Sequence, residues 1–283
     1  MSLPPASPTR FSYPGAPVTD LWTDLLACLE LRPAEGDSEF EGANQRLGYH
    51  RLFGGQLLGQ FVRAASLACP GKTVKSVHAL FARAGRPDEP VRYEVTVHHE
   101  GGRFATLGIV ARQSPGVVAT ASVSMHVPED GPDHQTPFHV PPVPGEEHSV
   151  NLDLLPWDTR AVTDIDTPKP ETPEYELWMR TPAVRPELAP ALTAYATDLS
   201  LIGTALRQVE GVGQHDANTA FTSAVTAHTV RFHRPFRTDS WLLLRQHSPL
   251  LAHGRCYGRG DVLTEEGSLV ASYAQEALLR FKN

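Results

Sequence analysis

The sequence predicts an α+β fold in which two similar halves each wrap a long antiparallel sheet around one central helix. Three observations predict it. A helix followed by four strands occurs twice in the 283-residue chain, the connections between strands are short, and the first helix is apolar on most of its sides. Only a curled, twisted sheet can cover such a helix nearly all round. We therefore expect a tandem fold, with its halves at residues 19–127 and 174–283.

The two halves can be aligned with each other. Laid over one another they place His78 on His228 without a gap, and residues 117–121 match residues 269–273 further along. Few residues are identical, so the argument depends on the shared order of strands and turns. A chance resemblance between two strand-rich halves is the alternative to a true duplication.

The first half begins with a short strand at residues 40–43 and a helix that starts near Gly54. Apolar residues follow at helical spacing until Pro70 and Gly71 end the helix. Four strands come next, separated by turns that contain glycine or proline. They are expected at residues 76–82, 91–98, 103–112 and 117–127.

The second half repeats this order. A strand is expected at residues 175–180 and a helix around residues 198–208. Four further strands are expected at residues 223–232, 240–247, 254–263 and 268–281. Their short connections again imply antiparallel neighbours.

Two segments fall outside the repeat. Residues 1–18 contain prolines where a signal peptide needs a continuous apolar core, so we expect an N-terminal arm. Residues 128–173 are rich in proline, aspartate and glutamate and are too irregular for a core element. Because the second segment also contains Leu152 and Trp157, we predict a linker that packs on the surface.

Composition argues against several classes of function. The net charge of -7 provides no basic field for a nucleic-acid backbone. No stretch approaches the roughly 18 apolar residues of a membrane span. Cys28, Cys69 and Cys256 are odd in number and widely spaced, which fits reduced thiols in the cytoplasm. We expect a cytoplasmic protein that binds neither nucleic acid nor membrane.

The motifs of several common enzymes do not occur in the sequence. Gly71-Lys72-Thr73 is spelled like the end of a phosphate-binding loop, but Ser66 stands where that loop needs glycine. No G-x-S-x-G, G-x-G-x-x-G or H-E-x-x-H motif is present. His98 and His99 are adjacent on a strand and face opposite sides. We expect structural or surface histidines, no metal and no cofactor.

Two polar residues stand where a buried element would be apolar. Asp198 lies at the start of the second central helix, either as an N-cap worth about 1 kcal/mol or as a carboxylate that accepts a proton from water. Gln275 interrupts the apolar run at residues 269–279, whereas its counterpart in the first half is Val123. A buried amide with satisfied hydrogen bonds is the alternative for Gln275. The asymmetry predicts a polar site in the second half alone.

Five segments together carry a resemblance to one family. They are FGGQLLGQ at residues 53–60, residues 76–83, YATDL at 195–199, FHRPF at 232–236 and residues 269–276. In these segments the chain resembles the acyl-CoA thioesterase II (TesB-like) enzymes, which have a double hotdog fold. The resemblance implies a thioester hydrolase, with acyl-CoA as substrate, on a tandem hotdog of the kind already expected from the duplication.

The resemblance also implies a catalytic site in which an Asp, a Ser or Thr, and a Gln hold a water. It places the Asp on Asp198 and the Gln on Gln275, but the position of the hydroxyl residue is occupied by Val225. Either Ser223 or Thr226 substitutes, the reaction uses two residues, or activity is poor. Ser223 shares a strand face with Val225, whereas Thr226 needs a bulge to reach that face.

The mechanism we expect is direct attack by water without a covalent intermediate. Asp198 would accept the proton while Gln275 orients the water. Backbone N–H groups near Gly54 and Gly55 would stabilise the oxyanion. The matching segments further suggest Gly54, Gly55, Gln56 and His78 as substrate-binding residues.

Two other functions remain open from the sequence. Val225 is compatible with a protein that binds acyl-CoA and has weak or lost hydrolysis. Hydration of an enoyl-CoA is the other, although the Asp and His pattern associated with hydratases is not found. We expect hydrolysis of fatty acyl-CoA, and a homo-oligomer because pairing would protect strand edges.

Overall fold

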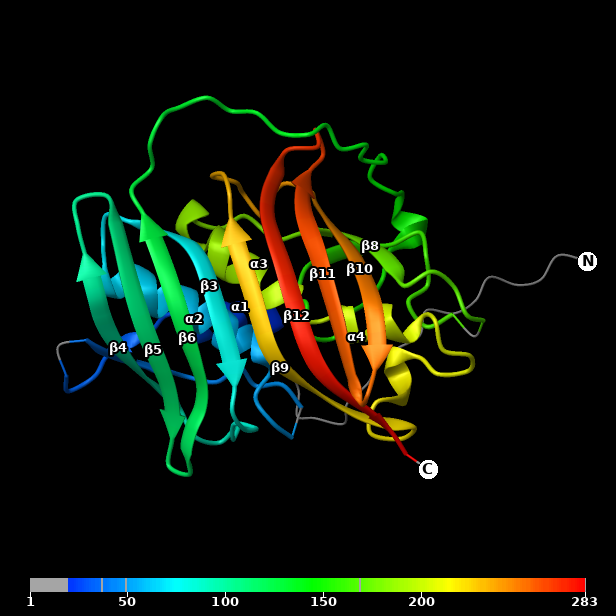
Figure 1. Ribbon diagram of the computed structural model, residues 1–283, viewed down its shortest axis with the longest axis horizontal. Coiled ribbons are helices and arrows are strands. Elements are labelled where there is room, and N and C mark those ends of the chain that lie inside the picture. Colours follow the sequence, from blue (N-terminus) through cyan, green and yellow to red (C-terminus); the bar gives the residue numbers. More distant parts are fainter. Residues whose placement is uncertain (1–19, 37, 49, 168, 283) are drawn as a thin grey trace, which may run out of the picture.

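The computed structural model describes residues 20–36, 38–48, 50–167 and 169–282. The predicted N-terminal arm, residues 1–18, lies outside the described residues. A single sheet of 12 strands runs through the protein in the order β1-β2-β4-β5-β6-β3-β9-β12-β11-β10-β8-β7. In Figure 1 its strands run side by side across the front and the helices lie behind them. The α+β tandem fold expected from the sequence is confirmed.

The first half follows the predicted order closely. The central helix α2 (Gly54–Ala68) is flanked by β2 (Glu39–Gly42) and by four longer strands: β3 (Thr73–Phe81), β4 (Val91–Glu100), β5 (Phe104–Gln113) and β6 (Gly116–His126). Two elements were not predicted, α1 (Leu21–Cys28) and the two-residue β1 (Arg32–Pro33). The side chain of Asp20 caps α1 by accepting the Trp22 N–H at 3.2 Å.

The second half contains the predicted strands and a different helical part. Its strands are β8 (Glu174–Arg180), β9 (Phe221–Phe232), β10 (Leu242–Ala252), β11 (Arg255–Thr264) and β12 (Leu269–Phe281). The prediction of a single helix around residues 198–208 is wrong. Two shorter helices, α3 (Ala189–Thr197) and α4 (Leu201–Leu206), replace it, and Asp198 lies between them. Since every residue of α3 except Pro190 is buried, no polar face reveals its period.

The sheet itself displays the duplication. Strand order outward from the centre is β3, β6, β5, β4, β2 on one side and β9, β12, β11, β10, β8 on the other. The halves join where β3 pairs with β9, and His78 lies opposite Thr229 in that register. His78 is exposed and His228 is fully buried, so the gapless alignment of these two histidines is wrong by one residue. A shift of one residue in a strand exchanges its two faces, which the sequence alignment could not detect.

The segment between the halves is more structured than the linker expected. In Figure 1 it arches from the end of β6 over the top of the sheet. It then forms a 3-10 turn (Glu146–His148) and the edge strand β7 (Asp158–Arg160), which pairs with β8. Leu152 and Leu155 are buried in the main core. Its leucines therefore belong to the hydrophobic core and do more than cover the surface.

Two further 3-10 turns complete the fold, at Pro186–Leu188 and Gln214–Asp216. The main core extends through both halves, because Leu58 and Phe61 of α2 belong to the same buried cluster as Leu192 of α3 and Leu244 of β10. Within the described residues, no helix is long and apolar enough to cross a membrane.

Candidate active site

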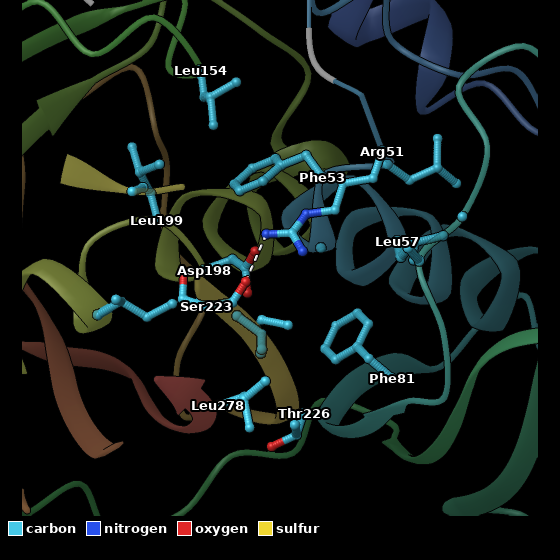
Figure 2. Close-up of a pocket in the computed structure, with 18 of the residues that line it drawn as sticks. Arg51, Phe53, Leu57, Phe81, Leu154, Asp198, Leu199, Ser223, Thr226 and Leu278 are labelled. Atoms are coloured by element: carbon cyan, nitrogen blue, oxygen red, sulfur yellow. Dashed lines mark hydrogen bonds between the residues drawn. The ribbon is translucent and has the colours of Figure 1, made fainter. Parts of the chain in front are cut away.

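A cavity of about 460 Å³ opens where the start of α2, the break between α3 and α4, and the first part of β9 come together. Its wall is mainly apolar, with Phe53, Leu57, Phe81, Leu199, Phe221 and Leu278 among the lining residues (Figure 2). Among the residues that the structure describes, four with ionisable side chains line it: Arg51, Arg83, Asp153 and Asp198. A largely apolar pocket with few polar groups is the usual form of a small-molecule site.

Asp198 lies at the cavity wall and is 5 % exposed. Burial raises its pKa to about 7, although the Gly55 N–H and the positive charge of Arg51 both act to lower it. Gly54 provides the space for this carboxylate, since a Cβ there would lie 2.7 Å from Asp198 Oδ2. Asp198 follows α3, and Ser200 holds the N-cap position of α4. The N-cap interpretation of Asp198 is therefore wrong.

Gln275 and His228 form a buried pair next to Asp198. They lie directly opposite each other on β12 and β9, and His228 Nδ1 is 2.9 Å from Gln275 Oε1. The other ring nitrogen, Nε2, is 3.0 Å from the Thr197 hydroxyl, and Nδ1 is 3.9 Å from Asp198 Oδ1. Burial lowers the pKa of His228 to about 4, so the ring is neutral near pH 7.

Two buried polar atoms of this group lack a partner within the described residues, Asp198 Oδ1 and Gln275 Nε2. One accepts hydrogen bonds and the other donates them, and both belong to side chains beside the same His228 ring. Buried polar groups in folded proteins are normally satisfied, often by an ordered water. A water that donates to the carboxylate and accepts from the amide would satisfy both atoms.

Strand β9 contains a bulge at Thr226, next to Val225. From the sequence, Thr226 needs such a bulge to reach the strand face of Val225. Opposite β12, Ala227 pairs with Glu276 and Val225 pairs with Ala277, which leaves Thr226 as the extra residue. Thr226 lines the cavity, but its hydroxyl donates to the Glu276 carbonyl at 3.0 Å.

Ser223 and Val225 line the cavity as well. The Ser223 carbonyl accepts from Arg51 Nη2 at 2.9 Å, and Figure 2 shows the Arg51 guanidinium reaching toward Ser223 and Asp198. No side-chain hydrogen bond occupies the Ser223 hydroxyl in the described part of the chain. Of the two hydroxyls proposed to replace the missing one, that of Ser223 is the less engaged.

The four predicted substrate-binding residues separate into two groups. Gly54 lines the cavity, and the ligand contact predicted for it stays a prediction. Gly55 is not among the lining residues; it packs closely on the backbone of Tyr195 beside Gly54. Gln56 does not line the cavity, because its Oε1 accepts the Gln45 N–H at 2.9 Å inside a buried polar network. His78 lies on the exposed face of β3, 2.6 Å from the Thr229 hydroxyl. The expectation of ligand contacts there is corrected for these two residues.

His228 is the site residue that the sequence did not reveal as functional. We expect structural or surface histidines from the sequence, because their spacing along the strands does not fit a metal site. The signal that could have revealed His228 is its position on β9 directly opposite Gln275 on β12. That position can be recognised only when the register between the two strands is known. That register includes the bulge at Thr226.

The remaining chemistry is simple. All three cysteines are free and buried, and burial raises the pKa of Cys256 to about 11, so it is a poor nucleophile. Among the residues that the structure describes, no group of three or more His, Cys, Asp or Glu side chains could hold a metal ion.

Two family models match the chain. The acyl-CoA thioesterase N-terminal domain matches residues 44–126 and the acyl-CoA thioesterase C-terminal domain matches residues 127–279. Acyl-CoA thioesterase 2 of Haemophilus influenzae is 27% identical over 289 residues, covering 93% of this chain and 99% of that protein. Human acyl-coenzyme A thioesterase 8 is 28% identical, covering 95% of this chain and 92% of that protein.

Solved structures agree with these matches. The acyl-CoA thioesterase II TesB2 from Mycobacterium marinum is 28% identical and superposes with a TM-score of 0.76, covering 92% of this chain and 99% of that one. A hotdog-fold protein from Alicyclobacillus acidocaldarius, 17% identical with a TM-score of 0.69, shares the fold.

Proposed function

The chain belongs to the acyl-CoA thioesterase family, and from that membership we propose that it hydrolyses fatty acyl-CoA to a free fatty acid and coenzyme A by direct attack of water. The observation that carries the proposal is a pair of buried atoms, Asp198 Oδ1 and Gln275 Nε2, for which the described part of the chain offers no hydrogen-bond partner. They are complementary in hydrogen bonding and lie beside an apolar cavity that can take an acyl chain.

In the first step, ionised Asp198 accepts a proton from the water, which attacks the thioester carbonyl carbon. Gln275 Nε2 donates a hydrogen bond to the water oxygen and so orients the water for attack. The hydrogen bond between neutral His228 Nδ1 and Gln275 Oε1 keeps the Gln275 amide in place. The Gly55 N–H already bonds Asp198. The oxyanion therefore uses the Gly54 N–H at the positive end of α2.

In the second step, the tetrahedral intermediate collapses and the carbon–sulfur bond breaks. The thiolate of coenzyme A leaves and takes the proton that Asp198 accepted, and the acyl group departs as the fatty acid. Asp198 returns to its ionised form, so no covalent intermediate forms and no external base is needed. Its pKa of about 7 suits a group that both accepts and returns a proton near neutrality.

The substitution at Val225 is the reason to consider binding without hydrolysis. Val225 cannot hydrogen-bond a water, but Asp198 and Gln275 are retained around one His228 ring. A general base and an oriented donor are sufficient for water attack, and Ser223 supplies a hydroxyl at the same cavity wall. These retained groups favour hydrolysis over binding alone.

We also expect a cytoplasmic homo-oligomer that uses no cofactor. The buried free thiols fit a reducing compartment. The edge strands β1 and β7 are only 2 and 3 residues long, and β1 ends in Pro33, so the expected pairing of strand edges has little support and subunits would meet through other surfaces. Light scattering during size-exclusion chromatography would give the number of subunits.

The test is release of free thiol from short, medium and long acyl-CoAs by the wild type, Asp198→Asn and Val225→Thr. We expect turnover by the wild type and a loss of about 100-fold or more in Asp198→Asn, the scale of a lost general base. Asp88→Asn, an exposed carboxylate outside the cavity, is the control and should match the wild type. Turnover only in Val225→Thr would instead identify a binding protein.

A further inference from the structure

Two arginines occupy equivalent places in the two halves of the protein. Arg83 comes two residues after the end of β3, and Arg234 two residues after the end of β9. The intervening residues make the same backbone bond, from Ala82 N–H to the Val118 carbonyl and from His233 N–H to the Val270 carbonyl, both at 2.9 Å. The duplication therefore places both guanidinium groups against a hairpin of the same kind.

Each arginine donates a hydrogen bond to one backbone carbonyl of the neighbouring hairpin. Arg83 Nη1 donates to the Pro115 carbonyl before β6. Arg234 Nη1 donates to the Leu269 carbonyl at the start of β12, at 2.8 Å. The structural task of the two arginines is the same in both halves.

The rest of the guanidinium group differs between the halves. Arg234 is bound by the linker: Nε and Nη2 donate to the two carboxylate oxygens of Asp133, and Nη1 donates to Gln135 Oε1. That ion pair raises the pKa of Arg234 and lowers the pKa of Asp133. Arg83 has no carboxylate against it among the described residues, and its side chain is exposed and lines the cavity. Arg234 of the second half therefore shows which kind of group an arginine at this position binds: an anion with paired oxygens, here the Asp133 carboxylate.

A second cation lies on the same rim of the cavity. The Leu52 N–H donates to the Gly85 carbonyl at 3.0 Å, so the segments that carry Arg51 and Arg83 run next to each other. Arg51 reaches over the wall to the Ser223 carbonyl, as Figure 2 shows. Of the acidic lining residues, Asp198 performs the proton transfer and Asp153 comes from the linker.

Much of the cavity lining is apolar. Ile202 and Ala217 belong to it and pack on the buried cluster that contains Phe221 and Leu279. Leu199 and Ile202 follow Asp198 closely in the chain and line the cavity with it. A thioester bound at Asp198 can therefore direct its acyl chain toward Ile202 and its polar part toward the arginines.

We propose that Arg83, with Arg51 beside it, binds a phosphate of the coenzyme A moiety at the rim of the cavity. The proposal rests on the proposed function, since it assigns a place to the polar half of that substrate. A phosphate presents paired oxygens like those of Asp133, and the planar guanidinium of Arg83 matches them with two parallel N–H groups. Arg83 thus binds substrate through a part remote from the reacting carbonyl.

The experiment compares two thioesters of the same acyl group in wild type, Arg83→Gln and the control Arg103→Gln. One thioester is the acyl-CoA and the other is the acyl-N-acetylcysteamine, which has no phosphate. Arg103 is a highly exposed residue outside the cavity. In Arg83→Gln we expect KM for acyl-CoA to rise about tenfold, the scale of a lost charged hydrogen bond, with kcat nearly unchanged. kcat/KM for the phosphate-free thioester should stay within twofold of wild type.

Equal losses on the two thioesters would overturn the proposal, because they would show a general effect on the fold. Arg83→Lys keeps the charge but not the planar fork and should give a smaller rise in KM. If Arg83→Gln does not fold, the same selective rise in Arg83→Lys upholds the proposal and its absence overturns it.

Calorimetry with coenzyme A itself separates this proposal from the proposed function. If the wild type hydrolyses neither thioester, the proposed function fails. Weaker coenzyme A binding in Arg83→Gln but not in Arg103→Gln would still uphold the phosphate site, and an unchanged Kd would overturn it.

Dephospho-coenzyme A then distinguishes the two phosphate sources. A defect that disappears with it identifies the 3′-phosphate, and one that persists identifies the diphosphate.

Discussion

Burial changes the two ionisable groups of the site in complementary ways. It raises the pKa of Asp198 to about 7 and lowers the pKa of His228 to about 4, because in both cases the charged form loses its hydration. Near neutral pH the histidine is therefore a neutral hydrogen-bonding residue. Asp198 is therefore the member of the pair that we propose as the proton acceptor.

The pH dependence of catalysis should follow Asp198. The carboxylate accepts a proton only when ionised, so kcat/KM should fall as pH decreases below about 7, with one proton involved. In Arg51→Gln the fall should begin at higher pH, since Arg51 acts to lower the pKa of Asp198. Rates measured between pH 5 and 9 would check this. A rate independent of pH across that range would exclude Asp198 as the base.

The hydroxyl that accompanies Asp198 can be identified by removing each candidate. Ser223→Ala should lower kcat several-fold without lowering Tm, because the Ser223 hydroxyl makes no internal hydrogen bond among the described residues. Thr226→Val should leave kcat nearly unchanged and cost about 1 kcal/mol of unfolding free energy, since it removes the bond to the Glu276 carbonyl. Steady-state kinetics and denaturant unfolding of both variants would test this. The reverse pattern would assign the role to Thr226.

At the scale of elements, the position of the proposed catalytic carboxylate, Asp198, depends on a break between helices. α3 ends at Thr197 and α4 begins at Leu201, so Asp198 lies between the two helices, and its carboxylate lies next to Gly54 at the start of α2. The bulge in β9 at Thr226 similarly changes which residues face the cavity. Both irregularities occur where the site is formed.

The approach of α2 to Asp198 predicts the effect of a methyl group at Gly54. Alanine favours a helix by roughly 1 kcal/mol over glycine, but this Cβ would lie 2.7 Å from Asp198 Oδ2 and displace the carboxylate. Gly54→Ala should lower kcat at least tenfold while changing Tm little. Gly102→Ala, where a Cβ has open space around it, is the matched control. Normal kcat in Gly54→Ala would show that Asp198 tolerates the shift.

At the scale of the whole molecule, the two halves share one sheet and one core. β3 pairs with β9 across the centre, and the main buried cluster includes residues from α2, α3 and both sets of strands. Neither half could separate without exposing the edge of a long strand and part of that core.

We therefore expect the protein to unfold in a single cooperative transition. Far-ultraviolet circular dichroism reports on the strands of both halves. In a Trp22→Phe variant, the fluorescence of the remaining tryptophans reports on the second half and the segment before it. The two denaturation curves should coincide. Two separate midpoints would show that the halves fold independently despite their shared sheet.

Much of the fold was predictable because it depends on local patterns. Alternating strands, short turns and the apolar helix at Gly54 predicted the tandem α+β arrangement, and the polar interruptions at Asp198 and Gln275 marked two residues that the structure places beside one histidine. The errors came where burial removes the pattern. α3 has no polar face, and His78 and His228 looked equivalent although they lie on opposite faces of the sheet.

The sequence by itself determined the order of the main strands, the first central helix, the duplication, and Asp198 and Gln275 as the candidate acid and amide residues. Only the tertiary structure decided which residues meet: His228 with Gln275, Gly54 with Asp198, and Arg83 with the cavity while Arg234 is bound by the linker. The reason is physical. Hydrophobic and turn patterns act over a few residues, whereas register, bulges and the pKa of a buried group depend on packing between segments far apart in the chain.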